Sequence, residues 1–327
     1  MNWNGKKVLV TGAGGFIGSH LVDSLVERGA DLRAMVHYNS VGSWGWLDES
    51  QYKNDIRVVA GDITDQGSVW QAAEGTECDF HLAALIAIPY SYVAPASYVQ
   101  TDVGGTLNVL EAARRLGIER VVHTSTSEVY GTALQVPISE AHPLQGQSPY
   151  SASKIGADKL AESYYRSFDV PVVTVRPFNT FGPRQSARAV IPTIITQCLC
   201  GDTVRLGSLT PTRDMNYVKD TVDGFLRAAE AGSAVGRTIN LGSGQDISIG
   251  DLAALIAELM GKEVAIDSEQ DRLRPPRSEV ERLLSDNSLA RELIGWQPEI
   301  GLRQGLQETI NWCAENLSKY RVDTYNV

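Results

Sequence analysis

Tyr150 and Lys154 stand four residues apart at the start of a segment predicted to be helical, so their side chains share one face. A lysine ammonium beside a phenol favours the phenolate and lowers the pKa of the phenol. The tyrosine then becomes a usable base at neutral pH. The pair predicts proton abstraction by Tyr150, although the same spacing also recurs by chance in proteins without this chemistry.

A second group of reactive side chains, Thr126-Ser127-Glu128, follows the predicted strand Arg120–Thr124. The carboxyl edge of a parallel sheet is where such sheets bind ligands. Thr126 can hydrogen-bond a substrate hydroxyl beside Tyr150. Glu128 is the single carboxylate in a loop rich in hydroxyls, which indicates either a proton-transfer group or a solvated loop acid.

Glycines at positions 12 and 15 separate the predicted strand Lys6–Thr11 from the predicted helix Ile17–Arg28, and a third, Gly18, lies at the start of that helix. Glycine lets the backbone turn tightly and approach a pyrophosphate, which then rests on the helix N-terminus. The strand before the glycines and the helix after them supply the context that this motif requires. The N-terminal segment therefore predicts a dinucleotide-binding loop.

The second strand normally ends in an acid that binds the adenosine ribose, but here it ends in Ala34-Met35-Val36-His37-Tyr38-Asn39. Arg33 and His37 lie nearby instead, and a cation suits a 2′-phosphate, so the pattern leaves NADP open beside NAD. Asp62, followed by Ile63, stands where an adenine contact is expected. A simple strand-end cap is the alternative for Asp62.

The elements that must position these residues alternate between strand and helix in the first half of the chain. The predicted strands are Lys6–Thr11, Leu32–Val36, Ile56–Ala60, Phe80–Ala83, Arg120–Thr124 and Val172–Arg176. The predicted helices between them are Ile17–Arg28, Ser68–Glu74, Thr101–Leu116 and Ser151–Ser167. This alternation predicts an α/β fold with a doubly wound parallel sheet of the Rossmann type.

After about Pro177 the alternation of strand and helix becomes less regular, glycine and proline are more frequent, and the predicted strands are shorter. The helices predicted there are Ile191–Cys200, Val218–Ala231, Ile249–Leu259, Ser288–Leu293 and Leu302–Leu317. We expect a dinucleotide-binding domain over 1–178 and a smaller α/β substrate domain over 179–327. Residues 216–244 are expected to thread back to the first domain.

Composition narrows the function classes. The chain has 327 residues and a formal net charge of −10, which argues against nucleic-acid binding because phosphate backbones need a basic face. The four cysteines lack metal-ligand spacing, so we expect no metal site and reduced thiols. No signal-peptide pattern and no apolar run of about 20 residues is present, so we expect a cytoplasmic protein away from membranes.

Together, these motifs resemble those of the extended short-chain dehydrogenase/reductases, the NAD-dependent epimerase/dehydratase family, over essentially the whole chain. Thr126, Tyr150 and Lys154 match the Ser/Thr–Tyr–Lys triad of that family. The resemblance implies bound NAD, with NADP open. The implied cofactor contacts, beside Tyr150 and Lys154, are Gly12, Gly15, Phe16, Ile17, Gly18, His37, Asp62, Ile63, Leu82, Ala83 and Ala84.

The resemblance also implies a nucleotide-sugar substrate. Asn179 is expected to touch its pyrophosphate, and Arg213 resembles the arginine that clamps the same phosphates. Arg274 and Arg277 are further candidates, and ordinary surface ion pairs are the alternative for all three arginines. The implied substrate contacts are Ile88, Asn179, Arg188, Arg213 and Arg274.

Within the family, Thr126-Ser127-Glu128 resembles the triplet of sugar-nucleotide 4,6-dehydratases, which UDP-xylose synthases also carry, whereas 4-epimerases have small neutral residues in place of Ser127 and Glu128. Longer runs, 81–90 and 208–214 among them, are similar to dehydratases of legionaminic acid biosynthesis. The expected reaction converts UDP- or GDP-N-acetylglucosamine to the 4-keto-6-deoxy sugar, with Glu128, or a group held by Ser127, as the acid that lets water leave from C6. A nucleotide-sugar 4-epimerase, a UDP-glucuronate decarboxylase and a non-catalytic sensor of the same fold remain as alternatives.

One residue departs from the family pattern: Asp102 replaces the asparagine usual at the start of its helix, which puts fine active-site geometry in doubt. The family also forms dimers through two helices of each subunit. The resemblance therefore implies a homodimer through Thr101–Leu116 and Ser151–Ser167.

Overall fold

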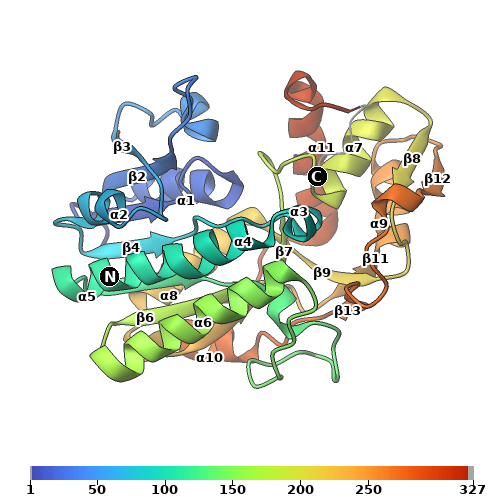
Figure 1. The fold of residues 1–327 in the computed structure, drawn as a ribbon. Helices are drawn as coiled ribbons and strands as arrows, with labels where there is room; N and C mark the ends of the chain where they lie inside the picture. The colour runs from blue at the N-terminus through green and yellow to red at the C-terminus, as the bar shows by residue number, and fades with distance from the viewer. Residues whose placement is uncertain (1, 323–327) are drawn as a thin grey trace.

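A seven-stranded parallel sheet forms the centre of the larger part of the molecule (Figure 1). The computed structural model describes residues 2–322. The strand order is β10-β6-β5-β4-β1-β2-β3. From β1 the chain adds β2 and β3 on one side and then continues with β4 on the other side of β1, so the sheet is doubly wound. The strands are β1 Lys7–Thr11, β2 Asp31–His37, β3 Ile56–Gly61, β4 Cys78–His81, β5 Arg120–Thr124, β6 Val172–Pro177 and β10 Thr238–Leu241.

Helices cover both faces of this sheet, as its almost continuously buried apolar strands require. One face carries α2 Gln66–Ala73, α5 Gly105–Leu116 and α6 Pro149–Phe168. The other carries α1 Phe16–Glu27, α8 Val218–Glu230 and α10 Ser288–Ile294. The predicted Rossmann-type fold is confirmed.

A smaller part lies beyond the carboxyl ends of the strands, at the right of Figure 1. Its sheets contain β7 Asn179–Phe181, β9 Thr212–Tyr217, β11 Asp246–Ser248 and β13 Arg282–Leu283 in one, and β8 Thr203–Leu206 with β12 Ala265–Ser268 in the other. Its helices are α7 Val190–Cys200, α9 Ile249–Leu259 and α11 Leu302–Glu315. Although β10 pairs with β6 in the main sheet, the division into two domains stays a prediction.

Short helical segments complete the chain. Two of them, α3 Ile88–Val93 and α4 Pro95–Tyr98, lead into a π-helical turn, η2 Val99–Gly104. The 3-10 turns are η1 Gly45–Glu49, η3 Ser127–Tyr130, η4 Gly232–Ala234, η5 Gln270–Arg272 and η6 Leu317–Lys319. Over residues 2–322, the structure has no helix long and apolar enough to cross a membrane.

Two predicted elements differ from those observed. The strand predicted at Phe80–Ala83 is Cys78–His81. The Ala83 N–H donates to the Thr11 hydroxyl at 3.2 Å, and the Leu82 N–H is shared between that hydroxyl at 3.2 Å and the Thr11 carbonyl oxygen at 3.3 Å. The single helix predicted over Thr101–Leu116 is the π-helical turn η2 followed by α5.

Candidate active site

A cavity of about 1190 Å³ lies between the main sheet and the smaller part. Ordinary small-molecule sites occupy about 300–1,000 Å³, so this cavity lies above the usual range for a single ligand. Nearly all of the residues predicted to bind or catalyse line it, although they come from both halves of the chain. Among the described residues, Arg33, Ser127 and Arg277 are the predicted candidates that do not line it; Ser127 is buried at the start of η3.

The glycine loop has the shape that a close ligand requires. Gly12 has φ +69°, and a Cβ there would lie 2.7 Å from the backbone nitrogen of Ala83. A Cβ on Gly18 would collide with the Gly12 carbonyl oxygen. Helix α1 begins with no side-chain cap and no acidic residue in its first turn. Its free N–H groups therefore favour an anionic group at this end of the cavity.

A buried hydrogen-bond chain fixes the backbone opposite the glycine loop. The Thr11 hydroxyl accepts from Leu82 and Ala83 and lies 2.9 Å from His81 Nδ1. His81 Nε2 lies 3.0 Å from the Thr106 hydroxyl. Burial, with His123 and Lys154 adding to it, holds the pKa of His81 well below its usual value, so the imidazole is neutral. The sequence gives no signal for this chain of side chains.

At the far end of the cavity, His37 replaces the expected acid and lies 3.8 Å (Nδ1 to Oδ2) from Asp62. Asp62 lines the cavity and also accepts from the backbone and hydroxyl of Thr64, both at 2.8 Å. Arg33, the other nearby cation, does not line the cavity. Its guanidinium donates instead to carbonyl groups at the C-terminal end of α2, Ala72 among them at 2.6 Å.

Tyr150 and Lys154 lie in the first two turns of α6 and both line the cavity. Burial raises the pKa of Tyr150, and a hydrogen bond with Thr126 opposes that rise. The Lys154 ammonium donates to the Thr124 carbonyl oxygen at 2.7 Å. The prediction that Lys154 lowers the pKa of Tyr150 is therefore wrong. Desolvation of the buried phenol raises this pKa and outweighs the groups that oppose the rise.

Glu128 lies beside Thr126, whose hydroxyl accepts the Glu128 backbone N–H at 3.2 Å. The carboxylate faces a buried cation: burial lowers the pKa of Arg213, and Glu128 is the first of the groups that oppose this. Thr126, Glu128 and Tyr150 thus belong to one site. A hydroxyl, a carboxylate and a phenol within one cavity can hold a substrate hydroxyl and move protons at two neighbouring atoms.

The predicted phosphate-binding arginines converge, with a partner that the sequence reasoning missed. Arg213 Nη2 lies 3.1 Å from Glu279, and Arg274 Nη1 lies 3.4 Å from the same carboxylate oxygen. Glu279 also lines the cavity. Its only sequence signal is its place shortly after two arginines, which does not separate it from a solvated acid.

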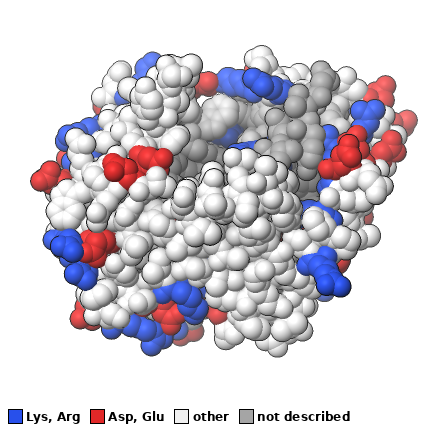
Figure 2. All heavy atoms as spheres, in the orientation of Figure 1, with Lys and Arg blue, Asp and Glu red and all other residues white. Residues whose placement is uncertain are grey.

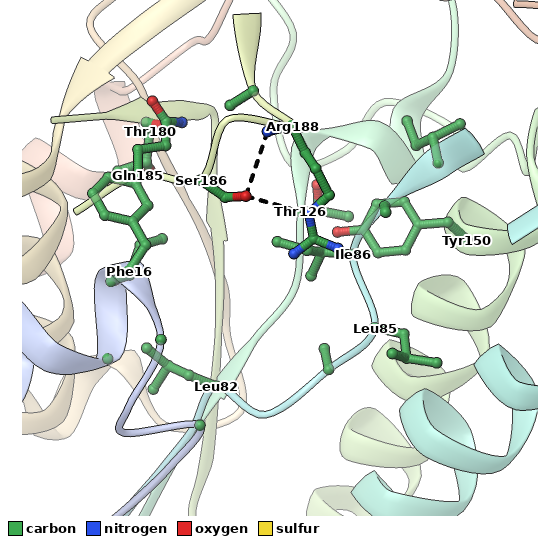
Figure 3. Close-up of a pocket in the computed structure, with 18 of the residues that line it drawn as sticks. Phe16, Leu82, Leu85, Ile86, Thr126, Tyr150, Thr180, Gln185, Ser186 and Arg188 are labelled. Atoms are coloured by element: carbon green, nitrogen blue, oxygen red, sulfur yellow. Dashed lines mark hydrogen bonds between the residues drawn. The ribbon is translucent and has the colours of Figure 1, made fainter. Parts of the chain in front are cut away.

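Two further predicted residues reach the cavity from the chain after β6. Figure 3 shows Arg188 extending from the loop before α7 toward Thr126 and Tyr150, with its Nε 3.4 Å from the Ser186 hydroxyl. The Asn179 amide nitrogen is buried and has no hydrogen-bond partner among the described residues. A buried donor without a partner is costly, so it is suited to an acceptor on a ligand.

Behind the cavity, a buried ionic network anchors the loop that carries Glu128. Asp158 on α6 accepts from Ser125 at 2.8 Å and from Arg176 at 2.8 and 3.1 Å, and its other oxygen lies 3.1 Å from His123. Arg176 also donates to the Tyr130 hydroxyl at 3.0 Å. Burial would raise the pKa of Asp158, but these partners lower it to about 2. Both ends of the loop 125–130 are therefore fixed by charge-assisted bonds.

Comparison with known proteins agrees with this geometry. A family model described as GDP-mannose 4,6 dehydratase matches residues 9–309. UDP-glucose 4-epimerase from Mycolicibacterium smegmatis is 34% identical over 94% of this chain and 98% of its own length. dTDP-glucose 4,6-dehydratase from an Actinoplanes strain is 33% identical, over 95% and 99%.

Solved structures are similar along nearly the whole chain. The dTDP-glucose 4,6-dehydratase of Streptomyces venezuelae, solved with NAD bound, has a TM-score of 0.87 at 28% identity, covering 96% of this chain and 99% of that one. The UDP-N-acetylglucosamine 4-epimerase of Methanobrevibacter ruminantium gives the same values. The chain thus belongs to the GDP-mannose 4,6 dehydratase family, among the NAD-dependent epimerases and dehydratases of the short-chain dehydrogenase/reductases.

Proposed function

We propose that the protein is a nucleotide-sugar 4,6-dehydratase that converts UDP- or GDP-N-acetylglucosamine to the 4-keto-6-deoxy sugar. The observation that carries the proposal is the presence of the Glu128 carboxylate in the same cavity as Thr126 and Tyr150. Oxidation at C4 needs one base, which takes the proton of the 4-hydroxyl. Loss of water from C5 and C6 needs a further group, which removes the C5 proton and protonates the leaving 6-hydroxyl. The resemblance to dehydratases of legionaminic acid biosynthesis supports N-acetylglucosamine as the sugar.

The cavity fits NAD as the resident cofactor. The uncapped start of α1 and the close approach at Gly12 suit its pyrophosphate, and the dehydratase of Streptomyces venezuelae holds NAD in the same fold. Lys154 and Tyr150 then lie at the nicotinamide end, and His37 and Asp62 at the adenosine end. Bound NAD supplies the hydride acceptor and a positive charge near the buried Tyr150 phenol.

The other half of the cavity suits the nucleotide sugar. Arg213 and Arg274 supply two cations, and Asn179 supplies the unpaired amide donor, all appropriate for a diphosphate. Ile88 lies close to Tyr150 in one apolar cluster, where a sugar ring can pack. Arg188 extends over the same region (Figure 3).

The residues of the chain divide the proton transfers. Tyr150 accepts the proton of the sugar 4-hydroxyl while Thr126 holds that oxygen. Glu128 removes the C5 proton, which the 4-keto group has made acidic, and delivers a proton to the 6-hydroxyl so that it leaves as water. The hydride taken from C4 is given back at C6 by bound NAD. C5 then takes up the proton that Tyr150 accepted, so Tyr150 and Glu128 recover their starting protonation and the reaction has no net change in redox state.

Mass spectrometry of the purified protein incubated with UDP- and GDP-N-acetylglucosamine, without added cofactor, tests the proposal. A product lighter by one water supports it and identifies the nucleotide. An isomer of unchanged mass contradicts it in favour of a 4-epimerase, the alternative supported by the 34% identity to the Mycolicibacterium enzyme. Loss of carbon dioxide from UDP-glucuronate would indicate a decarboxylase, and binding without turnover of any of these would indicate a sensor.

His37 is expected to set the choice between NAD and NADP. Replacing His37 by arginine places a permanent cation at the end of β2, on the adenosine side of the cavity. A charge-assisted bond to a 2′-phosphate is worth about 1.5–3 kcal/mol. We expect NADP affinity to rise about tenfold or more relative to NAD. Calorimetric titration of the cofactor-depleted protein measures both affinities. An unchanged ratio would mean that the 2′-position does not lie beside His37.

We also propose that the protein is a homodimer, formed through the helices α5 and α6. Figure 2 shows that the face over these helices is nearly free of charged side chains, which gather at its rim. Leu107 is 40% exposed and Val99 57% exposed on this side of η2 and α5. Ala152, a small residue on α6, is exposed as well. An exposed apolar area of this kind favours a partner helix pair.

Replacing Leu107 by aspartate should convert a dimer to a monomer, because the carboxylate would be buried in an apolar interface. Light scattering after size exclusion gives the mass in solution. Val41→Asp is the matched control, since Val41 is 83% exposed on the loop after β2, away from these helices. A wild-type protein of monomeric mass would contradict the proposal.

The four cysteines are free, which favours a reducing compartment, and we propose that the protein is located in the cytoplasm.

A further inference from the structure

Asp102 is a buried carboxylate that the proposed reaction does not use. It lies in η2, between α4 and α6, with 1% of its surface exposed. Its Oδ1 accepts the backbone N–H of Leu85 at 2.9 Å, and its Oδ2 accepts the Ser153 hydroxyl at 2.8 Å. Because a backbone N–H can only donate, the Oδ1 contact needs an acceptor, which a carboxylate or an amide oxygen provides.

Asp102 faces the catalytic pair. The ionisable groups that interact with it are Lys154 and Tyr150 on α6 and Tyr98 on α4. Burial lowers the pKa of Lys154, and Asp102 is the first of the groups that oppose this. Asp158 is the other, but its charge already faces Arg176 and His123. Among the described residues, Asp102 is therefore the carboxylate near Lys154 that has no other cation.

The same charge acts on Tyr150 in the opposite sense. Burial is the largest cause of the raised pKa of Tyr150, and the negative charges of Asp102 and, after it, Glu128 raise it further. An ionised Asp102 thus keeps the Lys154 ammonium charged and opposes formation of the Tyr150 phenolate. An asparagine in its place could keep both hydrogen bonds and would remove both electrostatic effects.

We propose that Asp102 is a positioning residue whose charge sets the pH range in which Tyr150 acts as a base, and whose Oδ1 fixes the backbone at Leu85 that opens into the substrate cavity. The proposal rests on the proposed role of Tyr150. On this proposal, Tyr150 and Lys154 have one more negative charge beside them than in an enzyme with asparagine at position 102.

The pH dependence of turnover in Asp102→Asn tests the charge. Loss of a neighbouring negative charge should move the limb that reports Tyr150 ionisation to lower pH, by about one pH unit. Ser153→Ala is the matched control: it removes the Oδ2 hydrogen bond but keeps the charge, so its limb should stay at the wild-type pH. A profile of Asp102→Asn that superimposes on the wild type would overturn the proposal. Asp102→Ser removes the same charge and gives the same expected shift if Asp102→Asn fails to fold.

A second readout does not depend on the reaction. Ultraviolet difference absorbance follows tyrosinate formation, and subtraction of Tyr150→Phe isolates the signal of Tyr150. The Tyr150 titration should move to lower pH in Asp102→Asn and not in Ser153→Ala. If the wild type fails to remove water from any nucleotide sugar, the proposed function fails, yet this titration still decides the role of Asp102. An unchanged titration contradicts that role whatever the reaction is.

Discussion

Replacing Glu128 by glutamine is expected to stop the loss of water while the first hydride transfer still occurs. Glutamine keeps the size and hydrogen-bonding capacity of the side chain but cannot accept the C5 proton at neutral pH. General acid–base groups contribute about 10²–10⁴-fold, so dehydration should fall by that factor. Single-turnover absorbance of reduced NAD, followed by mass spectrometry of the sugar, separates the two steps.

Glu140→Gln is the matched control for this variant. Glu140 lies on the same stretch of chain before α6 but outside the cavity, where it accepts the backbone N–H of Asn240 at 2.8 Å, and glutamine can accept the same bond. It should dehydrate at close to the wild-type rate. If Glu128→Gln also turned over near the wild-type rate, the role of Glu128 would be wrong, and the 4-epimerase would gain support.

Replacing Tyr150 by phenylalanine should block the reaction one step earlier. The ring keeps its place in the apolar cluster with Ile88 and Tyr98, but the oxygen that takes the proton of the 4-hydroxyl is lost. Turnover should fall by about 10²–10⁴-fold, with no accumulation of reduced NAD in the same single-turnover measurement. Accumulation of reduced NAD in Glu128→Gln but not in Tyr150→Phe would place the two residues in sequence.

Tyr164→Phe is the matched control on the same helix. Tyr164 is buried and its hydroxyl donates to Glu111 at 3.0 Å, outside the cavity. Loss of that bond should lower thermal stability slightly and leave the hydride step in place. Reduced NAD forming at the wild-type rate in Tyr150→Phe would show that another group accepts the C4 hydroxyl proton.

The sequence predicted the features that depend on local rules. The glycine loop needs only a strand, tight turns and a helix start, so Gly12 and Gly18 could be assigned from spacing and context. The alternation of apolar strands and helices similarly predicted the doubly wound sheet, which the structure confirms. Thr126 and Glu128 come shortly after the end of a predicted strand, and Tyr150 stands at the start of a predicted helix. The structure brings all three to one cavity.

Features that depend on packing between distant segments were missed. Arg33 was placed near the cofactor from its sequence position, but its side chain bonds to the end of α2. The pKa of Tyr150 was predicted from its neighbour Lys154 alone, whereas burial dominates it. Glu279 meets Arg213 because β13 and β9 pair across the smaller part. These contacts and this burial cannot be predicted from neighbouring residues in the sequence.

The network around Asp158 has a consequence for how such enzymes diverge. It clamps Ser125 and Tyr130 at the two ends of the loop, while Glu128 between them faces the cavity. We therefore expect exchange of Glu128 to leave these bonds intact, so that a change of chemistry at this position would need few mutational steps. The similar identities to an epimerase and a dehydratase are what such a history would leave. If Glu128 sets the reaction, as proposed, overall identity records descent whereas one loop position records the chemistry.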